Sequence, residues 1–160
     1  MHIASHAYYL NNNALEINSL LKSGIVLAGA NHPELNPQDD GYLTALEISK
    51  LNWIGTELVV ISACESGLGD IESGEGVYGI KRSISVAGAR SSLLSLWKVQ
   101  DSATAAFMES FYKKLINKEG RADALASTQK EFRNHPIEAW RHPNVWAAFQ
   151  LSGDWRPIDF

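Results

Sequence analysis

The hydrophobic pattern alternates short, fully apolar runs with longer segments in which apolar residues recur every three or four positions. The clearest run is residues 58–61 (Leu-Val-Val-Ile), and residues 92–97 form a second. Short β-branched or apolar runs without polar alternation predict strands that are buried on both faces of a sheet. Further strands are predicted at residues 2–5, 25–29 and 146–151.

The longer segments have the period of helices. In residues 77–87 the apolar positions fall on one side of a helix, and Gly88 suits its C-terminal cap. Helices are also predicted at residues 102–117, with Asp101 as N-cap, and at residues 122–132. The apolar side of the first of these is expected to comprise Ala105, Met108, Phe111, Tyr112 and Leu115.

Thr44 and Glu47 have the spacing of a capping box, which predicts a short helix through Leu51. Residues 8–13 and 31–41 are polar and are predicted to be loops. Strands that alternate with helices indicate an α/β sandwich with a mostly parallel sheet. No internal repeat or linker divides the chain, so residues 1–160 are expected to form a single domain.

Composition narrows the class of protein. The chain has 160 residues, of which 45% are hydrophobic, which suits one soluble globular domain. A net charge of -4 gives no electrostatic basis for direct binding to nucleic acid or to an anionic membrane. There is no apolar run long enough to span a bilayer and no signal peptide pattern. We expect a cytoplasmic location.

The single cysteine excludes an internal disulfide and a multi-cysteine zinc site. No two of the five histidines have the i, i+4 spacing of a helical zinc motif, so no metal site is expected. His32, His135 and His142 stand beside Pro or Asn in polar segments and are interpreted as solvated loop residues.

Cys64 and His6 carry the candidate chemistry. Each follows a predicted strand, and the loops beyond the carboxyl ends of parallel strands line the crevice where α/β proteins form their sites. A thiol acts as a nucleophile when a neighbouring base assists it, and an imidazole can be that base. His2 lies on the same face of the same strand and is the rival base. The alternatives are a buried, inert cysteine and a hydrogen-bonded core histidine.

Residues 67–76 form a glycine-rich loop before a predicted helix, a position at which phosphates bind in some proteins. The loop lacks the Gly-Lys-Ser/Thr ending of a P-loop, and the acidic Asp70, Glu72 and Glu75 would repel phosphate. A phosphate site is therefore the weaker interpretation.

Several segments, in one order along the chain, resemble the CHAT family of caspase-like cysteine peptidases of clan CD, which are commonly joined to tetratricopeptide repeats. The matching segments are residues 2–6 (His-Ile-Ala-Ser-His), 26–30, 40–48, 58–69 around Cys64, 88–89, 95–99, 111–112 and 146–154. The resemblance implies a three-layer α/β/α caspase-like sandwich and a cysteine endopeptidase that cleaves a partner protein. It implies no cofactor, and it suggests a tetratricopeptide-repeat region or sensor in the same polypeptide or complex.

The resemblance also implies roles for individual residues. His6 corresponds to the catalytic histidine and Cys64 to the nucleophile, and the backbone N–H groups of Ala7 and Cys64 correspond to the oxyanion hole. Gly67 and Gly69 would let the chain turn sharply past Cys64.

Two departures from the family pattern are visible. Ala7 stands where the family usually has Gly, and a Cβ at positive φ would cost roughly 1–2 kcal/mol. The chain also begins at the histidine strand, without the upstream strands of a full domain, which would leave an apolar sheet edge. We therefore expect the C-terminal, catalytic portion of a larger protein.

Four acids are candidates for binding a cationic substrate side chain: Asp39, Asp40, Glu65 and Asp101. Ser62 stands two positions before Cys64, where some relatives that select basic residues have an acid. The sequence does not assign specificity.

Two alternatives stay open. One is a catalytically inactive caspase-like interaction module or regulatory subunit. The other is a different cysteine hydrolase or an amidotransferase, although in those enzymes the histidine usually follows the nucleophile, whereas His6 precedes Cys64.

Overall fold

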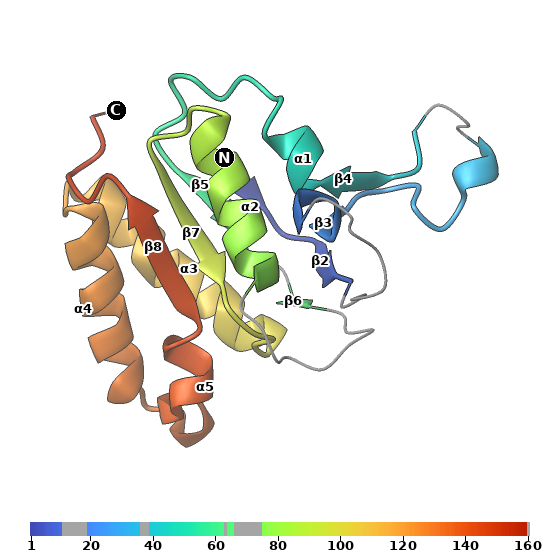
Figure 1. The fold of residues 1–160 in the computed structure, drawn as a ribbon. Coiled ribbons are helices and arrows are strands. Elements are labelled where there is room, and N and C mark those ends of the chain that lie inside the picture. Colours follow the sequence, from blue (N-terminus) through green and yellow to red (C-terminus); the bar gives the residue numbers. More distant parts are fainter. Residues whose placement is uncertain (11–18, 36–38, 63, 66–74, 160) are drawn as a thin grey trace.

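The computed structural model of the protein describes residues 1–10, 19–35, 39–62, 64–65 and 75–159 (Figure 1). In these ranges the strands form two four-stranded sheets. The central sheet contains, in order, β1 (His2–Ile3), β5 (Val59–Ile61), β7 (Ser91–Ser95) and β8 (Phe149–Gly153). β1, β5 and β7 are parallel, and β8 is antiparallel to β7. No helix in the described ranges is long and apolar enough to cross a membrane.

Helices cover both faces of the central sheet, which gives the predicted α/β architecture with three layers (Figure 1). They are α1 (Ala45–Ile48), α2 (Glu75–Val86), α3 (Asp101–Ile116), α4 (Arg121–Arg133) and α5 (Pro143–Trp146), with short 3-10 turns at Ser19–Leu21, Pro33–Leu35 and Glu138–Arg141. Val60 and Leu93 belong to the apolar cluster under α3 and α4, whereas Val59 and Ile61 belong to the cluster under α2. β5 is thus buried on both of its faces, as its sequence predicts.

The apolar side of α2 is confirmed. Ile80, Ile84 and Ala87 are buried and Val77 packs against the same cluster. Gly88 follows the helix with a φ of 99°, the left-handed conformation that a glycine C-terminal cap provides.

The prediction for α3 is partly wrong. Met108, Phe111 and Leu115 are buried as expected, but Ala105 is exposed, and Ala103 and Phe107 are buried in its place. Buried positions recur every fourth residue from Ala103, and the alanine-rich start of the helix gives no contrast from which to choose the face. Asp101 is the first helical residue rather than the N-cap, which is Gln100. Its carboxylate still lies in the first turn, where the helix dipole favours negative charge.

The capping box at α1 is confirmed. The Glu47 N–H donates to Thr44 Oγ1 (3.1 Å), and the Thr44 N–H donates to Glu47 Oε2 (2.8 Å). The helix ends at Ile48 rather than at Leu51.

The second sheet contains, in order, β4 (Tyr42–Thr44), β3 (Ser23–Val26), β2 (His6–Tyr9) and β6 (Cys64–Glu65). The expected loop at residues 8–13 is therefore wrong for Tyr8 and Tyr9. Tyr8 packs edge-on against Tyr42, with ring centroids 5.5 Å apart. Gly24 faces Tyr8 on one neighbouring strand and Thr44 on the other, and a Cβ there would stand 2.5 Å from the Leu43 carbonyl oxygen.

The predicted strands differ from the observed ones in their boundaries. The strand expected at residues 2–5 is β1, which ends at Ile3, and the strand expected at residues 92–97 is β7, which ends at Ser95. The strand expected at residues 25–29 is β3, which begins two residues earlier and ends at Val26, leaving Leu27 exposed. The strand expected at residues 146–151 is β8, and Trp146 belongs to α5 instead.

An ion cluster built around one buried arginine lies at the edge of the central sheet from which the parallel strands start. Arg121 is only 1% exposed, and its guanidinium pairs with Glu57, donates to the Arg156 carbonyl (2.9 Å) and lies 3.6 Å from Asp154. Glu57 also pairs with Arg90 at 3.1 Å. Hydrogen bonds from the side chain and backbone of Arg156 hold the pKa of Asp154 well below its usual range. The cluster joins the residues that precede β5 and β7 to the residue that follows β8.

We expect Glu57→Gln to lower the free energy of unfolding by roughly 2–3 kcal/mol, because it leaves the buried Arg121 guanidinium without its nearest carboxylate. Removal of one partner from a buried ion pair typically lowers the free energy of unfolding by about 3–5 kcal/mol. The loss should be smaller here because Asp154 remains close to Arg121. Urea unfolding measures the change. Glu109→Gln is the control, since Glu109 and Lys113 form an exposed pair on α3, and it should cause no measurable change. Equal losses in both variants would contradict the prediction.

Gly24→Ala should lower the free energy of unfolding by about 2 kcal/mol, because the added Cβ forces β3 away from β4 and Tyr8. Thermal or urea unfolding tests this against Ala28→Ser, a substitution at an exposed position close by. A Gly24→Ala protein as stable as the control would show that the second sheet accommodates the methyl group.

Candidate active site

One register brings the two candidate catalytic segments together. In the central sheet His2 lies opposite Val60 and Ile3 opposite Ile61; in the second sheet His6 lies opposite Cys64. Both pairings are parallel, and in each the facing residues are separated by the same number of positions along the chain. The register is thus continuous although the chain passes from one sheet to the other.

The backbone of Cys64 therefore faces that of His6 across the β2–β6 pair. Neighbouring strands lie about 4.7–4.9 Å apart, so this placement brings the two residues within reach of a shared substrate. Cys64 and Glu65 are placed by their backbone alone. The predicted turn at Gly67 and Gly69 lies outside the described residues, as does most of the loop at residues 67–76, of which Glu75 and Gly76 form the start of α2.

Ala7 is the second residue of β2. The only described non-glycine residue with positive φ is Lys118. The strain that a positive φ would impose on Ala7 therefore does not arise.

His6 lines a cavity of about 420 Å³ at the carboxyl ends of the parallel strands. Its polar wall carries imidazole, hydroxyl and carboxylate groups, contributed by His2, Ser5, His6, Ser62, Ser95, Asp101 and Thr104. Its apolar wall consists of Ala4, Trp97, Val99, Ala105, Met108 and Phe149. The first turns of α3 contribute to the lining through Asp101, Thr104, Ala105 and Met108. This is the position that α/β topology predicts for a binding site, and its size suits a side chain or a small ligand.

His2 and His6 differ in how their rings are used. His2 Nε2 is hydrogen-bonded to Ser62 Oγ (2.9 Å) and its Nδ1 to the Tyr112 hydroxyl (3.0 Å). Partial burial lowers the pKa of His2, so its ring is neutral at neutral pH. In the described part of the chain, the exposed ring of His6 has no hydrogen-bond partner. Among the described residues, His6 is therefore the candidate base whose ring nitrogens make no hydrogen bond, whereas both ring nitrogens of His2 are used.

The four candidate acids are separated by the fold. Asp101 lines the cavity with His6. Asp39 and Asp40 accept hydrogen bonds from the N–H groups of Gly41 (3.0 Å) and Tyr42 (2.9 Å), which shapes the turn before β4, and neither lines the cavity. The backbone of Glu65 lies opposite Ala7 in β6.

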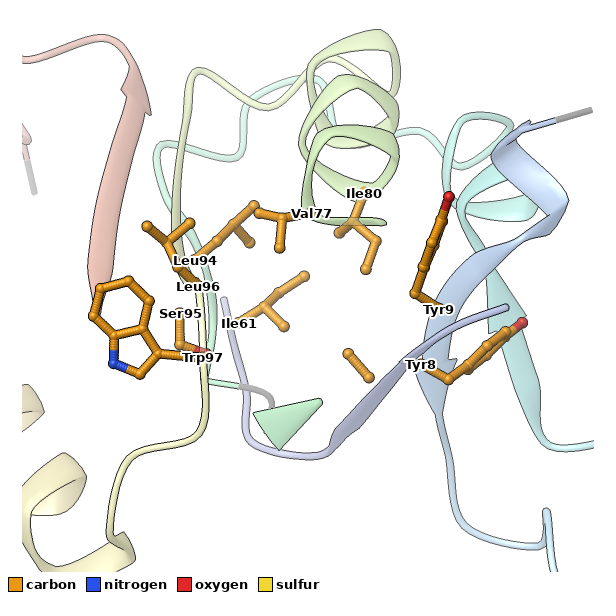
Figure 2. Close-up of a pocket in the computed structure, with 10 residues that line it drawn as sticks. Tyr8, Tyr9, Ile61, Val77, Ile80, Leu94, Ser95, Leu96 and Trp97 are labelled. Atoms are coloured by element: carbon orange, nitrogen blue, oxygen red, sulfur yellow. The ribbon is translucent and has the colours of Figure 1, made fainter. Parts of the chain in front are cut away.

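A second, narrow cavity of about 30 Å³ lies on the other side of the same strands (Figure 2). Val77 and Ile80 reach from α2 toward Ile61, and Tyr8 and Tyr9 of β2 stand on the far side. Ala7, Leu94, Ser95, Leu96 and Trp97 complete its lining, none of which is charged. Consecutive residues are thus divided between the cavities, with His6 and Ser62 on the larger side and Ala7 and Ile61 on the smaller.

The remaining histidines have structural surroundings. His32 is exposed and lies 3.1 Å from Glu34, as expected for a solvated residue. His135 is half-buried and packs against Phe132 and Trp140, and His142 accepts the Asn144 N–H at the start of α5, so the loop interpretation is incomplete for both. Among the described residues, no group of three His, Cys, Asp or Glu side chains is placed to hold a metal ion.

Comparison with known proteins places these features in a family. The family model of the CHAT domain matches residues 1–154. Human tetratricopeptide repeat protein 28 (Homo sapiens) is 31% identical over 117 residues, which is 73% of this chain and 5% of that protein. The mouse protein of the same name (Mus musculus) is 31% identical over 111 residues, which is 69% of this chain and 4% of that protein. The chain therefore spans only a small part of the length of these relatives.

Proposed function

The chain belongs to the CHAT domain family, and from that premise we propose that it is the catalytic portion of a caspase-like cysteine endopeptidase. The observation that carries the proposal is the pairing of His6 with Cys64 beside a cavity of about 420 Å³. A nucleophile and a base on adjacent strand ends, next to a space for substrate, are the parts that covalent catalysis requires.

In the proposed reaction, the Cys64 thiol loses its proton to His6 and the sulfur attacks the carbonyl carbon of a peptide bond. The negative charge that develops on the carbonyl oxygen is stabilised by the backbone N–H groups of Ala7 and Cys64. His6 then gives its proton to the leaving amine as the peptide C–N bond breaks, and a thioester remains on Cys64. Water, deprotonated by His6, hydrolyses the thioester and restores the thiol. No cofactor takes part.

We propose that the cavity receives a substrate side chain. Asp101 is the candidate acid that supports this best, because it shares the cavity with His6, whereas Asp39 and Asp40 are used in a turn elsewhere. The name of the relatives suggests a partner as well: a tetratricopeptide-repeat region in the same polypeptide or complex, which would present or sense the substrate.

The proposed dyad predicts that Cys64 reacts with iodoacetamide with an apparent pKa well below the value of about 8.5 for a free thiol. His6→Ala should return the pKa toward that value and slow alkylation at neutral pH about tenfold. Because Cys64 is the only cysteine, mass spectrometry reports its modification without ambiguity.

His32→Ala is the matched control, since His32 is exposed and paired with Glu34. If Cys64 titrates as a free thiol in the wild type and in both variants, the peptidase proposal is wrong and the interaction module takes its place.

The cavity predicts an effect on substrate that is separate from the nucleophile. Ala105→Trp should fill the cavity from an exposed position of α3 and lower kcat/KM for a peptide substrate roughly tenfold, mainly through KM, while Cys64 alkylation is retained. The substrate is found by screening a peptide library, with Cys64→Ser as the blank. Ala126→Trp, at an exposed position of α4, should leave the kinetics unchanged. Equal effects of both substitutions would contradict the assignment of the cavity.

A further inference from the structure

The strand pairing that aligns His6 with Cys64 is interrupted immediately before these residues. β1 ends at Ile3 and β2 begins at His6, while β5 ends at Ile61 and β6 begins at Cys64. Just before the interruption, the Ser62 N–H donates to the Ile3 carbonyl (3.2 Å). The register is the same on both sides of this gap, so the direction in which the chain leaves β5 at Ser62 bears on the alignment of Cys64 with His6.

A chain of side-chain hydrogen bonds reaches the near side of this gap, at Ser62. The hydroxyl of Tyr112, on α3, is 3.0 Å from His2 Nδ1, and His2 Nε2 is 2.9 Å from Ser62 Oγ. His2 faces Val60 in the ladder, so its bond to Ser62 runs diagonally, two residues further along the neighbouring strand. Diagonal pairs of this kind are within reach of long side chains and couple neighbouring strands. Ser62 is itself two positions before Cys64.

Tyr112 and His2 both have protonation states that suit two hydrogen bonds in series. Burial raises the pKa of Tyr112 to about 12, so it stays a phenol, and burial lowers the pKa of His2, so the ring stays neutral near pH 7. A neutral imidazole donates from one nitrogen and accepts at the other. Tyr112 on one side and Ser62 on the other can therefore both be satisfied by a single tautomer.

We propose that His2 is a positioning residue: supported by Tyr112, it orients Ser62 where the β1–β5 pairing ends and so keeps Cys64, two residues further along, opposite His6. This inference rests on the proposed peptidase function. It also gives the rival base a different task, because both nitrogens of His2 are occupied and its partner in the register is Val60 rather than Cys64.

Two substitutions of His2, by glutamine and by asparagine, separate its hydrogen bond to Ser62 from its hydrogen bond to Tyr112. The amide of a glutamine reaches about as far as Nε2 and can still bond Ser62, whereas the shorter asparagine reaches about as far as Nδ1 and cannot. We expect His2→Asn to slow Cys64 alkylation at neutral pH about tenfold and to move the apparent pKa of Cys64 toward that of a free thiol. The reason is that misplacement of a reacting group by about 1 Å can lower a reaction rate by about 100-fold. His2→Gln should restore most of the rate. Tyr112→Phe, which keeps the packed ring, should shift the profile in the same direction by a smaller amount.

Ile3→Val is the matched control for loss of stability in β1. It removes one methyl group from a half-buried side chain in the same strand and should leave the pH profile unchanged. Urea unfolding of each variant shows that the comparison is made on folded protein; should His2→Asn fail to fold, Tyr112→Phe decides.

The outcomes are distinct. A wild-type profile that depends on His6 but is unchanged in His2→Asn and Tyr112→Phe overturns the positioning role and leaves the proposed function standing. A similar shift in Ile3→Val also overturns it, because the effect is then one of general stability. A wild-type Cys64 that titrates as a free thiol overturns both proposals. Loss in His2→Asn with recovery in His2→Gln supports the role of His2.

Discussion

The parallel register between residues 2–7 and residues 60–65 is the constraint on which the site depends. Side chains alternate between the two faces of a strand, so a slip of one residue exchanges the faces. It would move Ser62 from the polar wall of the larger cavity into the apolar cluster under α2, and it would move Ile61 into the cavity. Burial of Ile61 thus fixes the alignment of His6 with Cys64, although Ile61 does not line the cavity that His6 lines.

The central strand β5 is held at both of its ends by polar groups and along its length by apolar packing. Glu57 precedes it in the ion cluster, and Ser62 follows it in the hydrogen-bond chain to α3. Between them, Val59, Val60 and Ile61 are at most 3% exposed and contact helices on alternate faces. A strand restrained in this way is a rigid base for the residues that extend beyond it, which is what a preorganised site requires.

The sequence predicts best the features that short-range patterns determine. The buried run at residues 58–61, the Thr44–Glu47 capping box and the apolar side of α2 each need only a few neighbouring residues for their recognition. The second sheet was missed because Tyr8 and Tyr9 show no alternation and their strand partners lie elsewhere in the chain. The bond between His2 and Tyr112 joins residues 110 positions apart, so no local pattern could reveal it. The same limit applies to the four candidate acids, which only the fold separates.

The ion cluster around Arg121 has a consequence for how sequences of this fold can diverge. Its charges come from the start of one strand, the end of another and the first turn of a helix, and the buried Arg121 guanidinium is tolerated because the carboxylates of Glu57 and Asp154 compensate it. Substitutions at positions 57, 121 and 154 should consequently be epistatic: a neutral residue that is harmful in one background becomes acceptable once the opposing charge has also been lost. We expect these three positions to change together during divergence, with the ion triad replaced by apolar residues as a set, while the opposite edge of the sheet is unaffected.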